Sequence, residues 1–338
     1  MDRLHRGSLQ RKKGRGMTSR TCWCGSDVLL PFSVEYQRCG ECGTLISQVG
    51  LSDSELKVVD DSVDFYGKQY WLNHQSNDLN FPNIYQRARN DLIERNLHWL
   101  RTLTKYCTPP AKILEIGCSH GSFVALLRQA GYDAMGMEMS PWVVQMAKET
   151  FDIPMAVGPL ETVELPKASF DVIALMDVLE HLPSPIETMR HALDLLKPGG
   201  SLLIQTPQFK EEMDYDKLVA TNAAFLEQLK SDEHLYLFTK DSANRLFRQI
   251  GATDMLFEPP IFDRYDMFFL VSRQPIRRLP DEEVAKSLET PKGRFVQALI
   301  DQDNYIKRLE AEIVTINADR EARLQQIHTL TAMVQSLQ

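Results

Sequence analysis

The middle of the chain alternates short apolar segments with longer amphipathic ones. The short segments predict strands at residues 112–116, 133–138, 171–176, 201–206 and 267–272, and the longer ones predict helices that include residues 123–130 and 185–196. Strands that alternate with helices form a parallel sheet covered on both faces. The pattern therefore predicts an α/β fold, a doubly wound core over residues 111–273.

An amphipathic segment precedes this core. Residues 84–106 predict one helix, with Leu92, Ile93, Leu97 and Leu100 on the face that packs. We treat residues 51–110 as a linker and cap helix. The linker holds an aromatic stretch at residues 64–71, which either belongs to the core or covers a substrate pocket.

The tail, residues 274–338, has a different period. From about residue 300, apolar residues recur at alternating steps of three and four, which is a heptad pattern. Arg320 and Arg323 occupy both seam positions in the middle. The pattern predicts a coiled coil, in a parallel homodimer, with a single helix that folds back on the core as the alternative. The apolar seam positions are Ile306, Leu309, Ile313, Ile316, Ile327, Leu330, Val334 and Leu337.

Charge and hydropathy narrow the classes of partner. The 46 acidic and 38 basic residues give a net charge of -8, which offers no broad attraction for nucleic-acid phosphates. No apolar run is long enough to span a bilayer. We therefore expect a small-molecule or glycan ligand, no nucleic acid and no transmembrane segment.

The first residues are basic and lack the apolar stretch of a secretory signal. We expect residues 1–17 to form a disordered leader, or Met17 to be the true start, and the protein to be cytoplasmic. A basic arm that binds an acidic surface is the alternative.

Four of the six cysteines form two close pairs. Cys22 and Cys24 make the first pair, and Cys39 and Cys42 make the second. In a reducing compartment, paired thiols at this spacing favour a structural zinc site with four protein ligands, within a small ribbon over residues 18–50. Residues 33–37 predict a strand of that ribbon. Incidental or redox-active cysteines are the alternative.

The first core strand leads into a glycine-containing turn. Gly117 and Gly121 allow the backbone to approach a cofactor closely, and the following helix start presents N–H groups to a carboxylate. The Gly-x-x-x-Gly spacing differs from the pattern of dinucleotide-binding proteins. The second strand ends at Glu138, where a carboxylate can accept both hydroxyl protons of a ribose.

Several of these segments together resemble the successive motifs of class I methyltransferases. They are Glu115–Cys118, Phe170–Ile173, Glu180–Leu182, Leu196–Gly200 and Thr206–Pro207. The similarity extends from about Cys22 to Ser272, and is greatest to bacterial methyltransferases of glycan and polysaccharide pathways that carry an N-terminal cysteine ribbon.

The resemblance implies a Rossmann-like sheet that binds S-adenosylmethionine. It implies that Glu115, Gly117 and Gly121 shape the methionine end and that Glu138 holds the ribose, although aspartate is commoner there. The segment from Gly158 to Glu161 is then expected to flank the adenine. The further positions expected to contact the cofactor are Cys118, Met139, Leu160 and Asp177.

The segment after the strand at 171–176 contains three titratable groups near the expected methyl donor. His181 or Glu180 can remove the proton of an acceptor hydroxyl. Alternatively, Asp177, Glu180 and His181 hold a divalent ion, as similarity to ubiquinone-pathway O-methyltransferases suggests, or the pair at 180–181 only anchors the next helix. His234 is a further candidate base, at the end of an insertion over residues 208–234 that we interpret as a lid.

The sequence thus predicts O-methylation of a sugar or glycan intermediate. Two alternatives remain. One is O-methylation of a quinone precursor or small aromatic compound, and the other is a non-catalytic scaffold that acts through the coiled coil.

Overall fold

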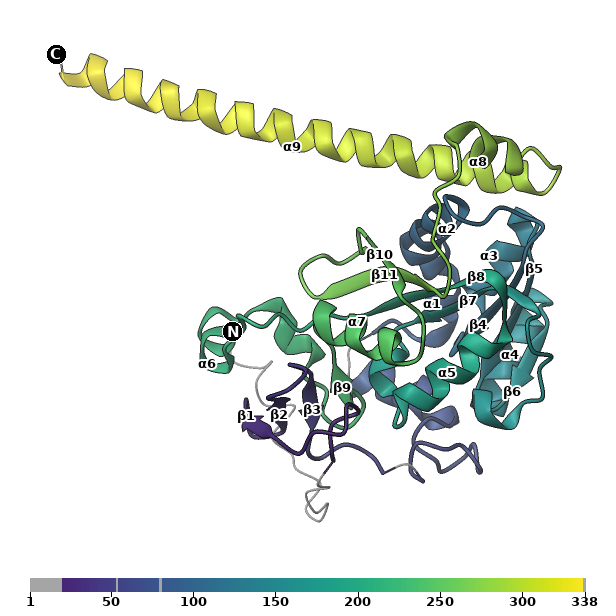
Figure 1. The fold of residues 1–338 in the computed structure, drawn as a ribbon. Coiled ribbons are helices and arrows are strands. Elements are labelled where there is room, and N and C mark those ends of the chain that lie inside the picture. The colour runs from purple at the N-terminus through teal and green to yellow at the C-terminus, as the bar shows by residue number, and fades with distance from the viewer. Residues whose placement is uncertain (1–19, 53, 79–80, 337–338) are drawn as a thin grey trace.

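The computed structural model describes residues 20–52, 54–78 and 81–336. The chain forms a seven-stranded sheet with helices on both faces, a small sheet near the N-terminus, and one long C-terminal helix (Figure 1). The predicted basic leader, residues 1–17, lies outside the described residues. No helix in the described ranges is long and apolar enough to cross a membrane.

The central sheet has the strand order β10-β11-β8-β7-β4-β5-β6. Strands β8, β7, β4, β5 and β6 are parallel, whereas β11 is antiparallel to β8 and β10 is antiparallel to β11. All five predicted strands are present, but the last one does not join a purely parallel sheet as predicted. The strands are β4 (Lys112–Ile116), β5 (Asp133–Glu138), β6 (Met155–Val157), β7 (Phe170–Met176), β8 (Leu196–Pro207), β10 (Asp254–Glu258) and β11 (Asp266–Ser272).

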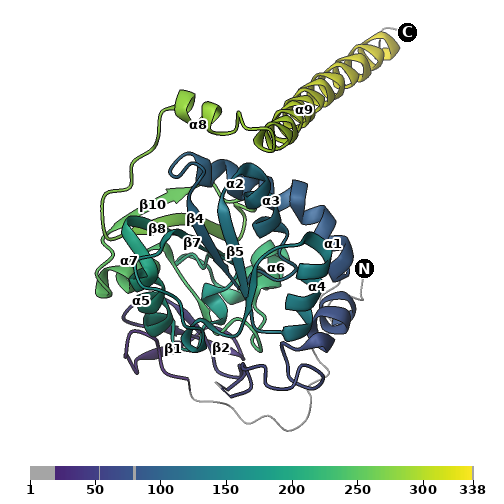
Figure 2. The ribbon, with the colours of Figure 1, turned by 90° about the vertical axis from the view of Figure 1, so that its right-hand side faces the viewer.

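Side chains from both faces of the sheet are buried, because helices cover each face. Along β4, Leu114 belongs to a buried cluster that includes residues of helices α5 (Pro185–Leu195) and α7 (Lys240–Gln249), whereas Ile113 belongs to a second cluster that includes residues of α2 (Leu97–Thr104) and α3 (Ser122–Ala130). The same alternation along β7 and β11 explains why these strands are apolar at almost every position. Figure 2 shows the sheet between its helices.

The helix predicted at residues 84–106 is not uniform. It comprises α1 (Ile84–Asp91), a π-helical turn η2 (Leu92–Asn96) and α2. Leu97 and Leu100 are buried as predicted, but Ile93 is 58% exposed. A π-turn rotates the residues that follow it relative to an ideal helix, so a 3.6-residue period drawn through the turn places Ile93 on the wrong face.

The small sheet contains a strand from outside the N-terminal region. Strands β1 (Leu29–Pro31), β2 (Tyr36–Cys39) and β3 (Leu45–Ser47) are antiparallel neighbours, and β9 (Tyr236–Leu237) pairs with β3. The strand predicted at residues 33–37 begins later, at Tyr36. We call residues 20–50 the ribbon; its sheet is therefore completed by the chain that leaves the insertion.

The insertion at residues 208–234 packs against the ribbon. It contains α6 (Tyr215–Thr221) and the 3-10 helix η5 (Ala224–Gln228). Its apolar side chains share one buried cluster with two ribbon residues; the cluster comprises Tyr36, Leu45, Phe209, Leu218, Phe225 and Leu237. The segment thus contributes to a second, smaller core, and its role as a lid stays a prediction.

Helix α8 (Asp281–Ser287) precedes the long helix α9 (Gly293–Ser336). The start of α9 is attached to the core through the buried Val296 and an ion pair between Arg101 and Asp303. Residues 304–336 are exposed throughout and project away from the core (Figures 1 and 2). The alternative that the tail folds back on its own core is therefore wrong, and the heptad seam is open along its described length.

Candidate active site

The predicted cofactor residues lie at one edge of the central sheet. Strands β4, β5, β7 and β8 are parallel, so the loops that follow them meet at their carboxyl ends. Ligands of open α/β sheets bind at such an edge. The turn at Gly117, the carboxylate of Glu138 and the segment around His181 all belong to it.

Both predicted glycines require the absence of a side chain. Gly117 has φ of 67°, and a Cβ there would lie 2.6 Å from Cγ2 of Val178, which follows β7. Gly121 has φ of 75°, and a Cβ would lie 2.4 Å from Cδ1 of Ile153. The left-handed backbone and the close contacts together strongly favour glycine at these positions.

Two buried polar atoms beside this turn have no hydrogen-bond partner among the described residues. They are Oε2 of Glu115 and Oγ of Ser119. Burial raises the pKa of the Glu115 carboxyl well above its ordinary value. Because buried polar groups are normally paired, these atoms indicate a place for a polar ligand. The α-amino group of S-adenosylmethionine would supply the missing donor, so the residues present fit this cofactor.

Glu138 is buried at the carboxyl end of β5 and is held by the backbone. Its Oε2 accepts from the N–H of Ser119 at 3.1 Å, and its Oε1 accepts from the N–H groups of Met139 at 2.8 Å and Ser140 at 3.3 Å. Burial raises the pKa of this carboxyl, and the three N–H donors oppose that shift. The carboxylate is thereby fixed in place, with acceptor capacity left for ribose hydroxyls.

The remaining predicted cofactor positions differ in their surroundings. Cys118 is buried with its Sγ 3.6 Å from Sδ of Met155, and Leu160 is buried at the start of the 3-10 helix η3 (Leu160–Thr162). Glu161 accepts a hydrogen bond from the hydroxyl of Thr188 on α5. Contacts of these side chains with adenine stay predictions.

Asp177 directly follows β7 and has a left-handed backbone with φ of 58°. Its Oδ2 lies 3.1 Å from Nη1 of Arg95, and its Oδ1 accepts from Nε2 of Gln205 at 3.0 Å. Arg95 comes from the π-turn η2. Both oxygens of Asp177 are thus occupied by partners on η2 and β8, which makes it a weak candidate for the predicted ion-binding group.

His181 and His234 lie together although 53 positions separate them. Their rings are 4.9 Å apart and nearly perpendicular. Nδ1 of His181 lies 2.9 Å from the carbonyl oxygen of Glu233, and Nδ1 of His234 lies 2.7 Å from that of Gln228. A carbonyl can only accept, so each Nδ1 carries the proton and each Nε2 presents a lone pair.

Burial keeps both imidazoles neutral. It lowers the pKa of His181, and it lowers the pKa of His234 well below the ordinary value, with the neighbouring His181 as a further cause. The pKa of Glu180 is raised well above its ordinary value, mainly by burial and then by the charge of Asp177. Oε2 of Glu180 accepts from the hydroxyl of Thr206, and its Oε1 lies 3.8 Å from Nε2 of His181.

The residues that could offer ligand atoms to a divalent ion are Glu180, His181 and His234, whose atoms lie within 4.8 Å of one another. The sequence predicted Asp177, not His234, as the third possible ligand beside Glu180 and His181. The structure does not support Asp177 in this group and instead brings in His234, which is distant along the chain.

A separate segment crosses the edge of the sheet above these groups. Asp61 accepts from the hydroxyl of Ser140 at 2.6 Å and from the N–H of Trp142 at 2.9 Å, at the start of helix α4 (Pro141–Phe151). The hydroxyl of Tyr66 lies 3.2 Å from Nδ1 of His181. Residues 61–66 therefore reach from the Glu138 side of the site to the histidines. Tyr66, Tyr70 and Trp71 are buried in the main apolar core, as expected of core aromatic residues, and a role in covering a substrate pocket stays a prediction.

The four ribbon cysteines converge on one point. Their sulfur atoms lie within 4.8 Å of one another, with Sγ of Cys22 at 3.4 Å from Cys42 and Sγ of Cys24 at 3.7 Å from Cys39. The hydrogen bond with Cys22 is the main cause that lowers the pKa of Cys42 to about 5. Four sulfurs bound to zinc at about 2.3 Å lie roughly 3.8 Å apart. The donor set and spacing fit a structural zinc ion.

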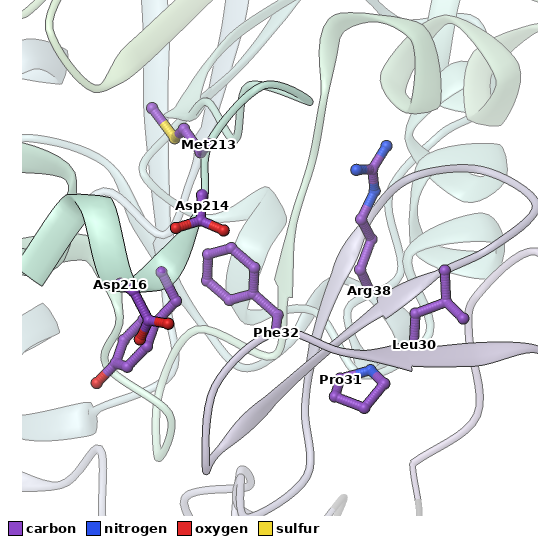
Figure 3. Close-up of a pocket in the computed structure, with 8 residues that line it drawn as sticks. Leu30, Pro31, Phe32, Arg38, Met213, Asp214 and Asp216 are labelled. Carbon is purple, nitrogen blue, oxygen red and sulfur yellow. The ribbon is translucent and has the colours of Figure 1, made fainter.

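A cavity of about 270 Å³ lies between the ribbon and the insertion (Figure 3). Phe32 stands near its centre, with its ring 5.9 Å from that of Tyr215 in an edge-on arrangement. Arg38 lines it from the ribbon, and Asp214 and Asp216 line it from the insertion. Polar and aromatic groups thus share a cavity whose lining includes none of the cofactor motifs.

The sequence did not identify three side chains that contact the predicted site. Arg95 reaches Asp177 from the π-turn, and Tyr66 reaches His181. Glu233 accepts from the hydroxyl of Tyr70 at 2.9 Å and lies 2.9 Å from Nε2 of His74. Only the aromatic stretch gave any signal, since an arginine in an amphipathic helix normally indicates a solvated face.

Comparison with known proteins shows that the segment carrying these motifs matches a known protein family. The sequence model of the methyltransferase domain family matches residues 85–255. A ubiquinone biosynthesis O-methyltransferase of Xanthomonas campestris is 29% identical over 104 residues, which are 29% of this chain and 44% of that protein. A mitochondrial ubiquinone biosynthesis O-methyltransferase of Schizosaccharomyces pombe is 31% identical over 108 residues, 30% of this chain and 39% of that protein. The chain spans less than half the length of the curated relatives it matches.

Solved structures are similar over the same region. An S-adenosylmethionine-dependent methyltransferase from Thermotoga maritima has 17% identity and a TM-score of 0.42, and the match covers 56% of this chain and 92% of that one. A magnesium protoporphyrin IX methyltransferase from Synechocystis has 15% identity and a TM-score of 0.41, with 56% and 86% covered.

Proposed function

The chain belongs to the methyltransferase family, and we propose that it transfers the methyl group of S-adenosylmethionine to an oxygen atom of its acceptor. Bound S-adenosylmethionine supplies a methyl group on a positively charged sulfur. Glu115, Gly117 and Glu138 shape its site. The unpartnered Oε2 of Glu115 is the observation that supports the cofactor most directly. We set aside the scaffold hypothesis, because a scaffold has no need for these groups.

We propose His181 as the base that takes the proton of the acceptor hydroxyl. Its Nε2 presents a lone pair, and its side chain is 22% exposed, whereas Glu180 is almost fully buried and already accepts from Thr206. His234 is buried beside it, and burial together with the neighbouring His181 lowers the pKa of His234 well below its ordinary value. An imidazole that is neutral at the working pH, and whose pKa lies near that pH, is an effective general base.

We propose a sugar or glycan hydroxyl as the acceptor. The sequence supports this, because the glycan-pathway methyltransferases that it resembles also carry a cysteine ribbon ahead of the core. A phenolic hydroxyl of a quinone precursor is the second candidate, and the names of the curated relatives favour it.

One assay separates these candidates. The purified protein is incubated with S-adenosylmethionine carrying a labelled methyl group, either with monosaccharides and nucleotide-linked sugars or with dihydroxybenzoates. Label transferred to a sugar supports the first proposal, and label on the aromatic ring hydroxyl supports the second. Binding of S-adenosylmethionine is measured by calorimetry in parallel, and its absence would contradict both.

The ribbon and the tail complete the proposal. We propose that Cys22, Cys24, Cys39 and Cys42 bind one zinc ion, which requires reduced thiols and thus a cytoplasmic location.

We also propose a parallel homodimer through α9. In the structure, Nε of the seam residue Arg323 lies 2.8 Å from Oδ2 of Asp319 on the same helix, which partly neutralises the charge in the middle of the seam.

A further inference from the structure

The ribbon binds the backbone of the segment that carries His234. We call residues 231–237 the bridging segment. The hydroxyl of Tyr36 donates to the carbonyl of His234 at 3.0 Å, and the hydroxyl of Ser47 donates to the carbonyl of Ser231 at 2.6 Å. The N–H of Ser47 donates to the carbonyl of Leu235 at 3.0 Å. The ribbon therefore holds this segment at both ends.

The opposite side of the bridging segment contacts the proposed base. The N–H of Leu235 donates to the carbonyl of Glu180 at 2.8 Å, and the carbonyl of Glu233 lies 2.9 Å from Nδ1 of His181. Both imidazoles thus depend on the position of one segment, His234 through its own backbone and His181 through its Nδ1 partner. A shift of the segment would turn the Nε2 lone pair of His181 away from an acceptor.

Tyr36 is well placed to fix that position. It is 1% exposed and packs in the apolar cluster between the ribbon and the insertion. It begins β2, which ends at Cys39, one of the proposed zinc ligands. Burial raises the pKa of its phenol well above the ordinary value, so the hydroxyl remains a donor.

We propose that Tyr36 is a positioning residue for methyl transfer, acting through the carbonyl of His234 on the His181–His234 pair. The ribbon then belongs to the working site. This inference rests on the proposed function, because it assumes that His181 is the base.

The experiment compares Tyr36→Phe with Tyr132→Phe in the full-length protein. Tyr132 is a matched control because it is also buried and its hydroxyl also donates to a backbone carbonyl, that of Cys107 at 2.6 Å, outside the ribbon and the bridging segment. Each variant is measured for melting temperature, affinity for S-adenosylmethionine, kcat and KM. The nitrogen resonances of the eight histidines are recorded by NMR and assigned with His181→Asn and His234→Asn.

We expect Tyr36→Phe to lower kcat by about tenfold, because a small misplacement of a catalytic group has a large effect on rate. KM and cofactor affinity should stay near the wild-type values, since Tyr36 contributes only to the alignment of the base. The resonances of His181 and His234 should move in Tyr36→Phe and stay in place in Tyr132→Phe.

Folded Tyr36→Phe with unchanged kcat and unchanged histidine resonances would overturn the proposal, and so would equal effects of the two variants. If no acceptor is methylated, the proposed function fails while the NMR comparison still decides whether Tyr36 positions the histidines. Ser47→Ala provides a second variant that removes a contact with the same segment.

Discussion

The carboxylate of Glu138 combines burial with three backbone donors, so it is held in place before any ligand arrives. Glu138→Ala should weaken binding of S-adenosylmethionine by about 100-fold, because hydrogen bonds to a charged group contribute about 1.5–3 kcal/mol each. Glu138→Gln keeps one acceptor oxygen and should have a smaller effect. Calorimetric titration measures both, with the exposed Glu149→Ala as control. Equal affinity of all three variants would remove Glu138 from the cofactor site.

His181 is the residue on which the proposed chemistry depends. His181→Asn should lower kcat by roughly 100-fold or more, because a positioned general base contributes about 10²–10⁴-fold. His191→Asn, on α5, is the matched control and should be close to wild type. Steady-state kinetics with the identified acceptor measure these rates. Full activity of His181→Asn would show that His181 is not the general base.

The pH dependence follows from the lowered pKa of His181. A base must be neutral, and a pKa below the ordinary value keeps the imidazole neutral to lower pH. The acidic fall in kcat/KM should therefore lie below pH 6.5, the ordinary histidine pKa. This fall should disappear from the residual activity of His181→Asn. A fall centred above pH 6.5 would contradict the assignment.

Of the parts of the fold, the ribbon is the one whose stability should depend most on a bound metal ion. Its strands are three or four residues long and its four thiols converge on one point. Such a small element rarely holds together by apolar packing alone. Cys42→Ser should lose bound zinc and lower the melting temperature, whereas Cys107→Ser, outside the cluster, should keep one zinc per chain. Metal analysis by mass spectrometry makes the comparison, and a wild-type protein without zinc would refute the site.

The role of the long helix α9 can be judged only from its place in the whole molecule. Its residues 304–336 are exposed in the single chain, and an isolated helix with an exposed apolar seam gains stability by pairing. Ile313→Asp should convert the proposed dimer to a monomer of 38.7 kDa. Val314→Asp is the matched control, because Val314 is the next residue and lies off the seam.

Light scattering after size-exclusion chromatography measures these masses. Wild type and Val314→Asp should have about twice the mass of the chain. A wild-type monomer would exclude the homodimer, and a dimer of Ile313→Asp would place the interface elsewhere.

Much of the fold could be predicted from the local pattern of apolar and polar residues in the sequence. The strands at 112–116 and 133–138 and the helix at 123–130 were predicted because a sheet covered on both faces leaves short, mostly apolar runs in the sequence, separated by amphipathic helices. Gly117 and Glu138 were accessible for the same reason, since a strand end fixes where the next residues lie. The direction of β11 was not accessible, because apolar content is the same in parallel and antiparallel strands.

The sequence alone determined the elements of the core, the cofactor motifs and the two cysteine pairs, because each depends on residues close together along the chain. The tertiary structure decided the rest. It brought His234 to His181, placed Tyr66 and Arg95 at the site, and made β9 the fourth strand of the ribbon sheet. These contacts join residues far apart in the chain, and no local period records which distant segment will fill a given space.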